Sequence, residues 1–162
     1  MLSECARATT AEEARFRVDY PNSAPRRIKI IALDQSAEGV VRRLAGGEWN
    51  SATFMTAVKG SAPAAKDWLA DLAGDALNLF DQISTADHVV TVSTAGENAD
   101  AAIIAEVCNA RRIMLTALVI DPANSPDAQL LRTMAPLRAC ASMLVVAKGE
   151  EYVEAMLTAL RA

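Results

Sequence analysis

The segment Ile28-Lys29-Ile30-Ile31-Ala32-Leu33, with the residues that follow it to Ala45, decides the fold of this chain. The first six residues form an almost wholly apolar run, which is typical of a strand buried on both faces of a sheet. Val40, Val41 and Leu44 then recur at helical spacing, and Gly46-Gly47 ends that pattern. A buried strand followed directly by a helix predicts the first half of a unit whose consecutive strands run parallel.

The same alternation continues along the chain. Further strands are predicted at 52–58, 88–92, 113–120 and 143–147, and helices at 100–110, 125–138 and 149–160. One more helix is predicted after Pro63, on apolar residues at helical spacing: Trp68, Leu69, Leu72, Ala76, Leu77, Leu79 and Phe80. These elements predict a three-layer α/β/α sandwich around a five-stranded parallel, Rossmann-like sheet, in the strand order 2-1-3-4-5 or, as the alternative, 3-2-1-4-5.

Composition limits the class of protein. The 162 residues, 52% of them hydrophobic, predict one globular domain over residues 27–162, and the break Pro21-Asn22-Ser23-Ala24-Pro25 predicts an N-terminal arm over 1–26. A net charge of −4 disfavours nucleic-acid binding, and no apolar run approaches the roughly 20 residues that span a bilayer. One histidine and three widely spaced cysteines fit neither a zinc site nor a disulfide framework, so we expect a cytoplasmic protein without a metal centre.

A ligand site, if there is one, is predicted where the strand order reverses. In open parallel sheets, ligands bind outside the carboxyl ends of the strands at this switch point, here between the strands at 28–33 and 88–92. The loops 34–39 and 93–98 border that point, and each leads into a helix N-terminus that favours an anion. The candidate ligand-binding residues are Asp34, Ser36, Glu38, Gly39, Ser93, Thr94, Ala95, Gly96 and Asn98.

The side chains of these loops have competing interpretations. Asp34 and Glu38 are either an acid/base pair, a divalent-cation site or acids that complement a helix dipole, and they repel phosphate. Ser93, Thr94 and Asn98 either bind an anion or form a turn and N-cap. No catalytic residue and no metal ligand is predicted.

Several segments resemble the FtsZ/tubulin family. Residues 28–44 are similar to that family's opening strand, which reads much like IKVIGVG and runs into a glycine-rich nucleotide loop. The stretch from Ala86 through Thr94-Ala95-Gly96 to Ala101-Ala102-Ile103-Ile104-Ala105-Glu106 resembles the central segment, where "TAG" precedes a helix like "AAPVIAE". Residues 115–120 are similar to the next strand. The resemblance covers 28–147 with gaps, and it implies the fold of an FtsZ-type nucleotide domain.

The departures from that family fall on its functional positions. Asp34-Gln35-Ser36-Ala37-Glu38 stands where the first loop has glycines, and the second glycine run is shortened to Gly96-Glu97-Asn98. No counterpart of the family's acidic catalytic loop is found, which implies that the machinery for GTP hydrolysis is absent. Residues 93–100 also resemble the phosphate loop of sugar isomerase (SIS) domains, with Ala95 and Asn98 in place of hydroxyl residues.

Two functions follow as hypotheses. The first is a non-catalytic FtsZ-like domain that acts by protein interaction, including self-association, or as a weak ligand sensor, with no cofactor. The alternative is a binding or enzymatic domain for a phosphorylated ligand, such as GTP, GDP or a sugar phosphate, held by loop 93–98. Outside these loops, Trp49 in the polar turn 46–50 either marks a partner site or packs over the sheet edge. His88, Cys108 and Cys140 are interpreted as structural residues.

Overall fold

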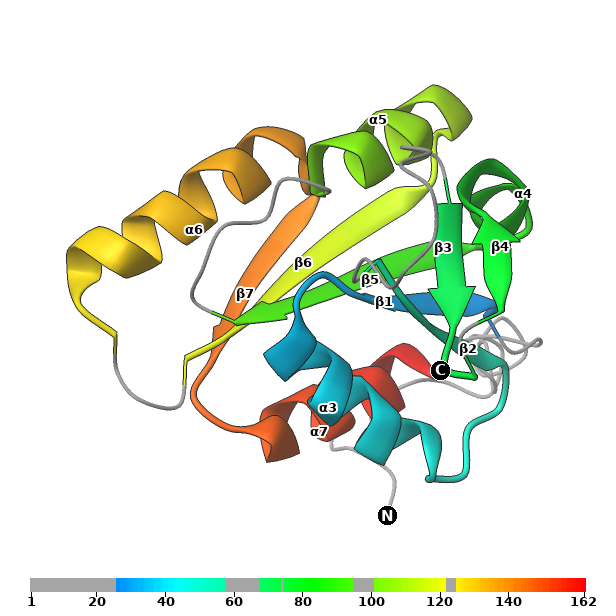
Figure 1. Cartoon of the computed structure of the whole chain (residues 1–162), viewed down its shortest axis with the longest axis horizontal. Coiled ribbons are helices and arrows are strands. Elements are labelled where there is room, and N and C mark those ends of the chain that lie inside the picture. The colour runs from blue at the N-terminus through cyan, green and yellow to red at the C-terminus, as the bar shows by residue number, and fades with distance from the viewer. Residues whose placement is uncertain (1–25, 58–67, 74, 95–100, 122–124) are drawn as a thin grey trace, which may run out of the picture.

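The computed structural model describes residues 26–57, 68–73, 75–94, 101–121 and 125–162. Strands and helices alternate through most of these ranges (Figure 1). The strands are β1 (Ile28–Ala32), β2 (Ala52–Thr56), β3 (Trp68–Asp71), β4 (Ala76–Asn78), β5 (His88–Thr94), β6 (Met114–Ile120) and β7 (Met143–Ala147). The helices are α3 (Gln35–Ala45), α4 (Leu79–Ser84), α5 (Ala101–Arg111), α6 (Asp127–Cys140) and α7 (Glu150–Leu160). The predicted arm, apart from Arg26, and Pro63 lie outside the described residues.

One mixed sheet joins all the strands, in the order β4-β3-β2-β1-β5-β6-β7. Five neighbouring strands pair in parallel, in the order β2, β1, β5, β6 and β7. Ile28 of β1 lies between Ala52 of β2 and His88 of β5. The predicted order 2-1-3-4-5 is therefore confirmed for the parallel strands. The alternative order 3-2-1-4-5 is wrong, because β1 pairs with the third parallel strand, β5, rather than the fourth. The sheet itself has seven strands and not five.

The extra strands replace part of the helix predicted after Pro63. β3 runs antiparallel to β2, β4 runs antiparallel to β3, and only Leu79–Ser84 is helical. The carboxylate of Asp71 closes the turn by accepting hydrogen bonds from the amides of Ala73 and Asp75 at 2.9 and 2.8 Å. The apolar residues of this segment suit the period of a helix as well as that of a strand. Pairing with β2 and the turn closed by Asp71 therefore decided that a β-hairpin forms here.

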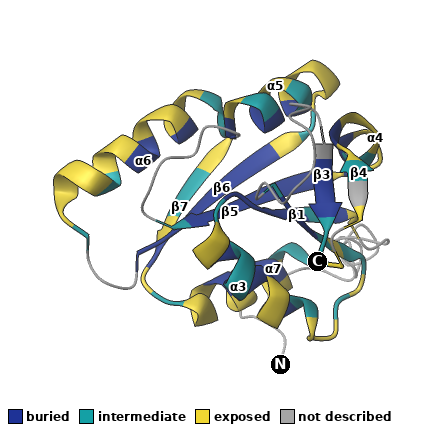
Figure 2. Ribbon diagram, viewed as in Figure 1, coloured by how far each residue is buried: buried dark blue, intermediate teal, exposed yellow. Residues whose placement is uncertain are grey.

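Helices cover both faces of the sheet. Helices α4, α5 and α6 lie along one face, and α3 and α7 lie along the other (Figure 1). The central strands are buried along most of their length, while the outer surfaces of the helices are exposed (Figure 2). Two apolar cores result, one beneath each helical layer. Among the described residues, no helix combines the length and apolar character needed to cross a bilayer.

Candidate functional site at the switch point

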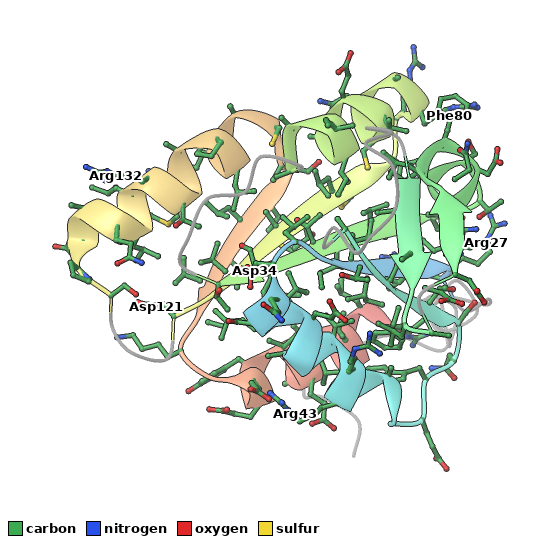
Figure 3. All side chains as sticks on the ribbon, in the orientation of Figure 1. Arg27, Asp34, Arg43, Phe80, Asp121 and Arg132 are labelled. Carbon is green, nitrogen blue, oxygen red and sulfur yellow. The ribbon has the colours of Figure 1, made fainter. Side chains whose placement is uncertain are left out.

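Asp34 occupies the point where the strand order reverses. It follows β1 and caps α3: its Oδ1 accepts a hydrogen bond from the Ala37 amide at 2.8 Å. The same carboxylate reaches across to the end of β5, where the Thr94 amide donates to Oδ2 at 2.6 Å and the Thr94 hydroxyl donates to Oδ1 at 2.9 Å. Figure 3 shows Asp34 where β1 passes into α3. One side chain therefore ties together the two strand ends that border the predicted crevice.

The first turn of α3 has no glycine cradle for a phosphate. The Ala37 amide is already bonded to the Asp34 side chain, and the Glu38 amide donates to the Asp34 carbonyl oxygen at 2.9 Å. Ser36 is exposed on this turn, and Gly39 lies further along the helix, beside Arg43. The Ala37 and Glu38 amides, which could otherwise hold an anion at the helix N-terminus, already donate to Asp34, and the Asp34 carboxylate occupies the N-cap position.

Glu38 is held by neighbours on the same side of the sheet. Arg42 donates to its Oε1 from both Nε and Nη2, at 2.8 and 2.5 Å, and the Thr56 hydroxyl donates to Oε2 at 3.3 Å. Arg42 also donates to the Leu72 carbonyl oxygen. Glu38 and Asp34 therefore take separate partners, as expected for acids that cap and brace a helix start. No group of metal-ligating side chains gathers anywhere in the described ranges.

The second predicted loop is described only at its beginning. Ser93 and Thr94 are the last residues of β5. Ser93 is 1% exposed, and its hydroxyl has no hydrogen-bond partner among the described residues. The remaining candidates, Ala95, Gly96 and Asn98, lie outside the described residues.

Asp121 is a further acidic residue at the carboxyl end of a parallel strand, and it was not singled out from the sequence. It is buried at the end of β6, its amide donates to the Ala147 carbonyl oxygen, and its Oδ1 accepts from the Ser125 amide at 2.8 Å. Hydrogen bonds from the Ser125 side chain and main chain lower the pKa of the Asp121 carboxyl, and the charge of Lys148 lowers it further. The pattern Ser125-Pro126-Asp127 predicts Ser125 as the helix N-cap, which is wrong: Pro126 caps α6 without a side-chain hydrogen bond, because Ser125 is bound to Asp121.

His88 and Cys108, which are interpreted from the sequence as structural residues, are both buried. His88 is 3% exposed and its Nε2 lies 2.8 Å from the Thr116 hydroxyl. Burial, with a smaller effect from the charge of Arg26, lowers the pKa of His88 and favours the neutral imidazole. Burial also raises the pKa of the Cys108 thiol to about 12, the pKa of a thiol poorly suited to nucleophilic attack at neutral pH.

Comparison with known proteins does not assign this chain to a family. No protein-family model matches this chain, and no curated protein shows significant similarity to it.

Proposed function

We propose that this chain is a non-catalytic α/β domain that acts by binding other protein chains, with no nucleotide at its switch point. The observation that carries the proposal is the Asp34 carboxylate, which caps α3 and bonds Thr94 across the switch point. A phosphate placed there would have to displace these hydrogen bonds. It would also face the Asp34 charge, and two like charges 4 Å apart repel by about 4 kcal/mol at an effective dielectric constant of 20.

A ligand screen tests the closed switch point. Thermal unfolding is measured with GTP, GDP, ATP, glucose 6-phosphate and fructose 6-phosphate, each with and without Mg²⁺. We expect no stabilisation by any of them. A ligand at 100 times its dissociation constant would stabilise the domain by about 2.7 kcal/mol, and such a response to any of these compounds would overturn the proposal.

The edge of β7, which pairs with no further strand among the described residues, supports the proposal that this chain binds other protein chains. β7 is the last strand of the sheet, and its sequence Met-Leu-Val-Val-Ala has neither a charge nor a proline to block a further strand. Met143 and Val146 are 40% and 39% exposed. We take a second copy of this chain as the occupant, because antiparallel pairing about Val145 presents the same edge from both copies.

Oligomeric state tests that surface. We expect light scattering after size exclusion to give a dimer whose fraction rises with concentration, and Val146→Lys to shift it to monomer by placing a charge on the edge. The control is Met114→Lys, an equally charged change at an exposed apolar residue of β6. A monomer at every concentration, or a dimer equally weakened by both variants, would count against this interface.

A second candidate function rests on Ser93. Its buried hydroxyl has no hydrogen-bond partner among the described residues, and Ser93 is the first residue of the predicted phosphate loop 93–98. This observation favours the alternative of a phosphorylated ligand, which the nucleotide and sugar-phosphate screen tests directly. Ser93→Ala would then abolish any stabilisation, while leaving the unliganded melting temperature nearly unchanged because no described hydrogen bond is lost.

The resemblance to the FtsZ/tubulin family enters as a proposal about ancestry. It rests on residues 28–44, 86–106 and 115–120, and these segments supply the neighbouring parallel strands β1, β5 and β6. A common origin of the fold with loss of the nucleotide site would account for similar strands beside acidic loops.

A further inference from the structure

A small hollow lies between the end of α3 and the beginning of α7, on the opposite side of the sheet from α5 and α6. Its volume is about 280 Å³, and it includes Trp49 from the turn after α3. The other lining residues that matter here are Arg43, Leu44, Glu150, Glu151 and Glu154. The volume is at the lower limit of small-molecule pockets, which suits a single side chain better than a nucleotide.

Trp49 forms a fixed wall of the hollow. Its indole N–H donates to the Leu44 carbonyl oxygen at 2.7 Å, and its ring centroid lies 5.9 Å from that of Phe54. The ring packs against the apolar core beneath α3 and α7 and is only partly buried. Of the two interpretations given to Trp49 from the sequence, packing on the sheet is confirmed, but the strand it contacts, β2, is not at the sheet edge because β3 and β4 lie beyond it. The exposed remainder of the ring still lines the hollow.

The hollow has an excess of negative charge. Arg43 pairs with Glu150, its Nε donating at 3.0 Å (Figure 3 labels Arg43). Among the described residues that line the hollow, the one guanidinium is therefore paired with one of three carboxylates. Glu150 and Glu151 lie in the first turn of α7, where acids complement the helix dipole. Glu154 lies one turn further on, four residues after Glu150, where two like charges destabilise a helix. The helix dipole therefore accounts for two of the acids and not for Glu154.

We propose that this hollow binds an arginine or lysine side chain of a partner protein. The cation would lie against the indole of Trp49, between the carboxylates of Glu151 and Glu154, neither of which forms an ion pair with a described residue, and it would gain a cation–π contact there. This site rests on the proposed function, because it assigns a chemical class to the partner of a protein-binding domain. Charge complementarity selects the occupant: an acidic or neutral side chain would gain nothing from these carboxylates.

Nuclear magnetic resonance of the indole N–H groups tests the site on the full chain. Trp49→Phe assigns the Trp49 signal among the two tryptophans. N-acetyl-arginine methylamide is then titrated into the wild-type protein, with N-acetyl-glutamine methylamide as a neutral probe of similar length. We expect a saturable shift of the Trp49 signal with the arginine probe and none with the glutamine probe.

Matched variants separate a built site from general attraction to an acidic protein. Glu151→Gln with Glu154→Gln should weaken arginine binding by about tenfold or more. The control pair, Glu106→Gln with Asp127→Asn, removes the same charge from exposed positions on α5 and α6 and should leave binding within about twofold. Unchanged positions of the other amide signals show that each variant keeps its fold.

The outcomes also distinguish this inference from the proposed function. No shift with the arginine probe, an equal shift with the glutamine probe, or equal losses in the two variant pairs would overturn the hollow as a cation site. None of those results bears on the switch point. Stabilisation by a nucleotide or sugar phosphate would overturn the proposed function whatever the indole signal does.

Discussion

Asp34→Ala is the substitution that tests most directly how the switch point is held. The change removes three hydrogen bonds: one from the Ala37 amide at the start of α3 and two from Thr94 at the end of β5. An N-cap is worth about 1 kcal/mol. Hydrogen bonds to a charged group contribute about 1.5–3 kcal/mol when fully buried, and since Asp34 is only partly buried we assign about 1 kcal/mol to each Thr94 bond.

The expected loss in the free energy of unfolding is therefore about 3 kcal/mol. For a domain of this size each kcal/mol corresponds to about 2–4 °C, so the melting temperature should fall by about 6–12 °C. Asp34→Asn keeps a good N-cap and one acceptor, and should lose only about 1 kcal/mol. Urea unfolding monitored by circular dichroism gives the free energies, and differential scanning fluorimetry gives the melting temperatures.

A double-mutant cycle with Thr94→Val identifies the cross-strand bonds as the cause. The coupling between the two positions should reach about 1–2 kcal/mol, because each single variant already removes the shared hydrogen bonds. Glu106→Ala, at an exposed position of α5, is the control and should change stability by less than about 0.5 kcal/mol. A loss below about 1 kcal/mol in Asp34→Ala, or effects of Asp34 and Thr94 that simply add, would refute the reasoning.

Three further outcomes follow from the described contacts. His88 is buried with its pKa below the usual 6.5, so the unfolded chain binds more protons than the folded chain near that pH. The free energy of unfolding should therefore fall as pH drops below about 6.5. Urea titrations across pH should show a weaker pH dependence of this free energy in His88→Gln. Cys108, buried with a thiol pKa of about 12, should stay unmodified by iodoacetamide in the native protein and react in urea. The half-buried Cys140 should react faster than Cys108 in the native protein. Peptide mass spectrometry measures both reactions, and prompt labelling of Cys108 in the native protein would contradict this prediction. Asp71→Ala removes the two hydrogen bonds that its carboxylate accepts from main-chain amides in the β3–β4 turn. Amide hydrogen exchange in that hairpin should become about tenfold faster, with no change in β5.

The central parallel strands β1, β5 and β6 were predictable because each is buried on both faces along most of its length. Such strands read as continuous apolar runs, as in 28–33 and 113–120, and the helices between them carry their own periodicity. Crossover rules then left two strand orders, and pairing of β1 with β5 selects the first. Local pattern and topology point the same way here, so the prediction held.

The β3–β4 hairpin was missed because its apolar residues suit two periods at once. Leu69, Leu72 and Leu77 lie at spacings compatible with a helix, yet Leu69 pairs across the hairpin with Leu77. Asp71 followed by Gly74 was the available turn signal in the sequence. A strand at the edge of a sheet gains its hydrogen bonds from a neighbour, which is information that a local window does not contain.

The candidate site shows the same division. The acidic character of loop 34–39 was visible in the sequence, and so was its poor match to a phosphate cradle. That Asp34 bonds Thr94, sixty residues away, was not visible, and neither was the contact of Asp121 with Ser125. Trp49 was singled out as a residue with two interpretations, but its place beside Glu151 and Glu154 depends on α3 and α7 covering the same face of the sheet.

By itself, the amino-acid sequence determined the alternation of buried strands and helices, because this depends on side-chain hydrophobicity over short stretches, and the crossover rules limited the five parallel strands to two orders. Tertiary structure alone decided which carboxylates meet distant groups: Asp34 with Thr94, Glu38 with Thr56, and Glu151 and Glu154 with Trp49. The physical reason is range. Burial patterns are written locally along the chain, whereas a hydrogen bond or an excess of charge depends on which distant residues folding brings within a few ångströms.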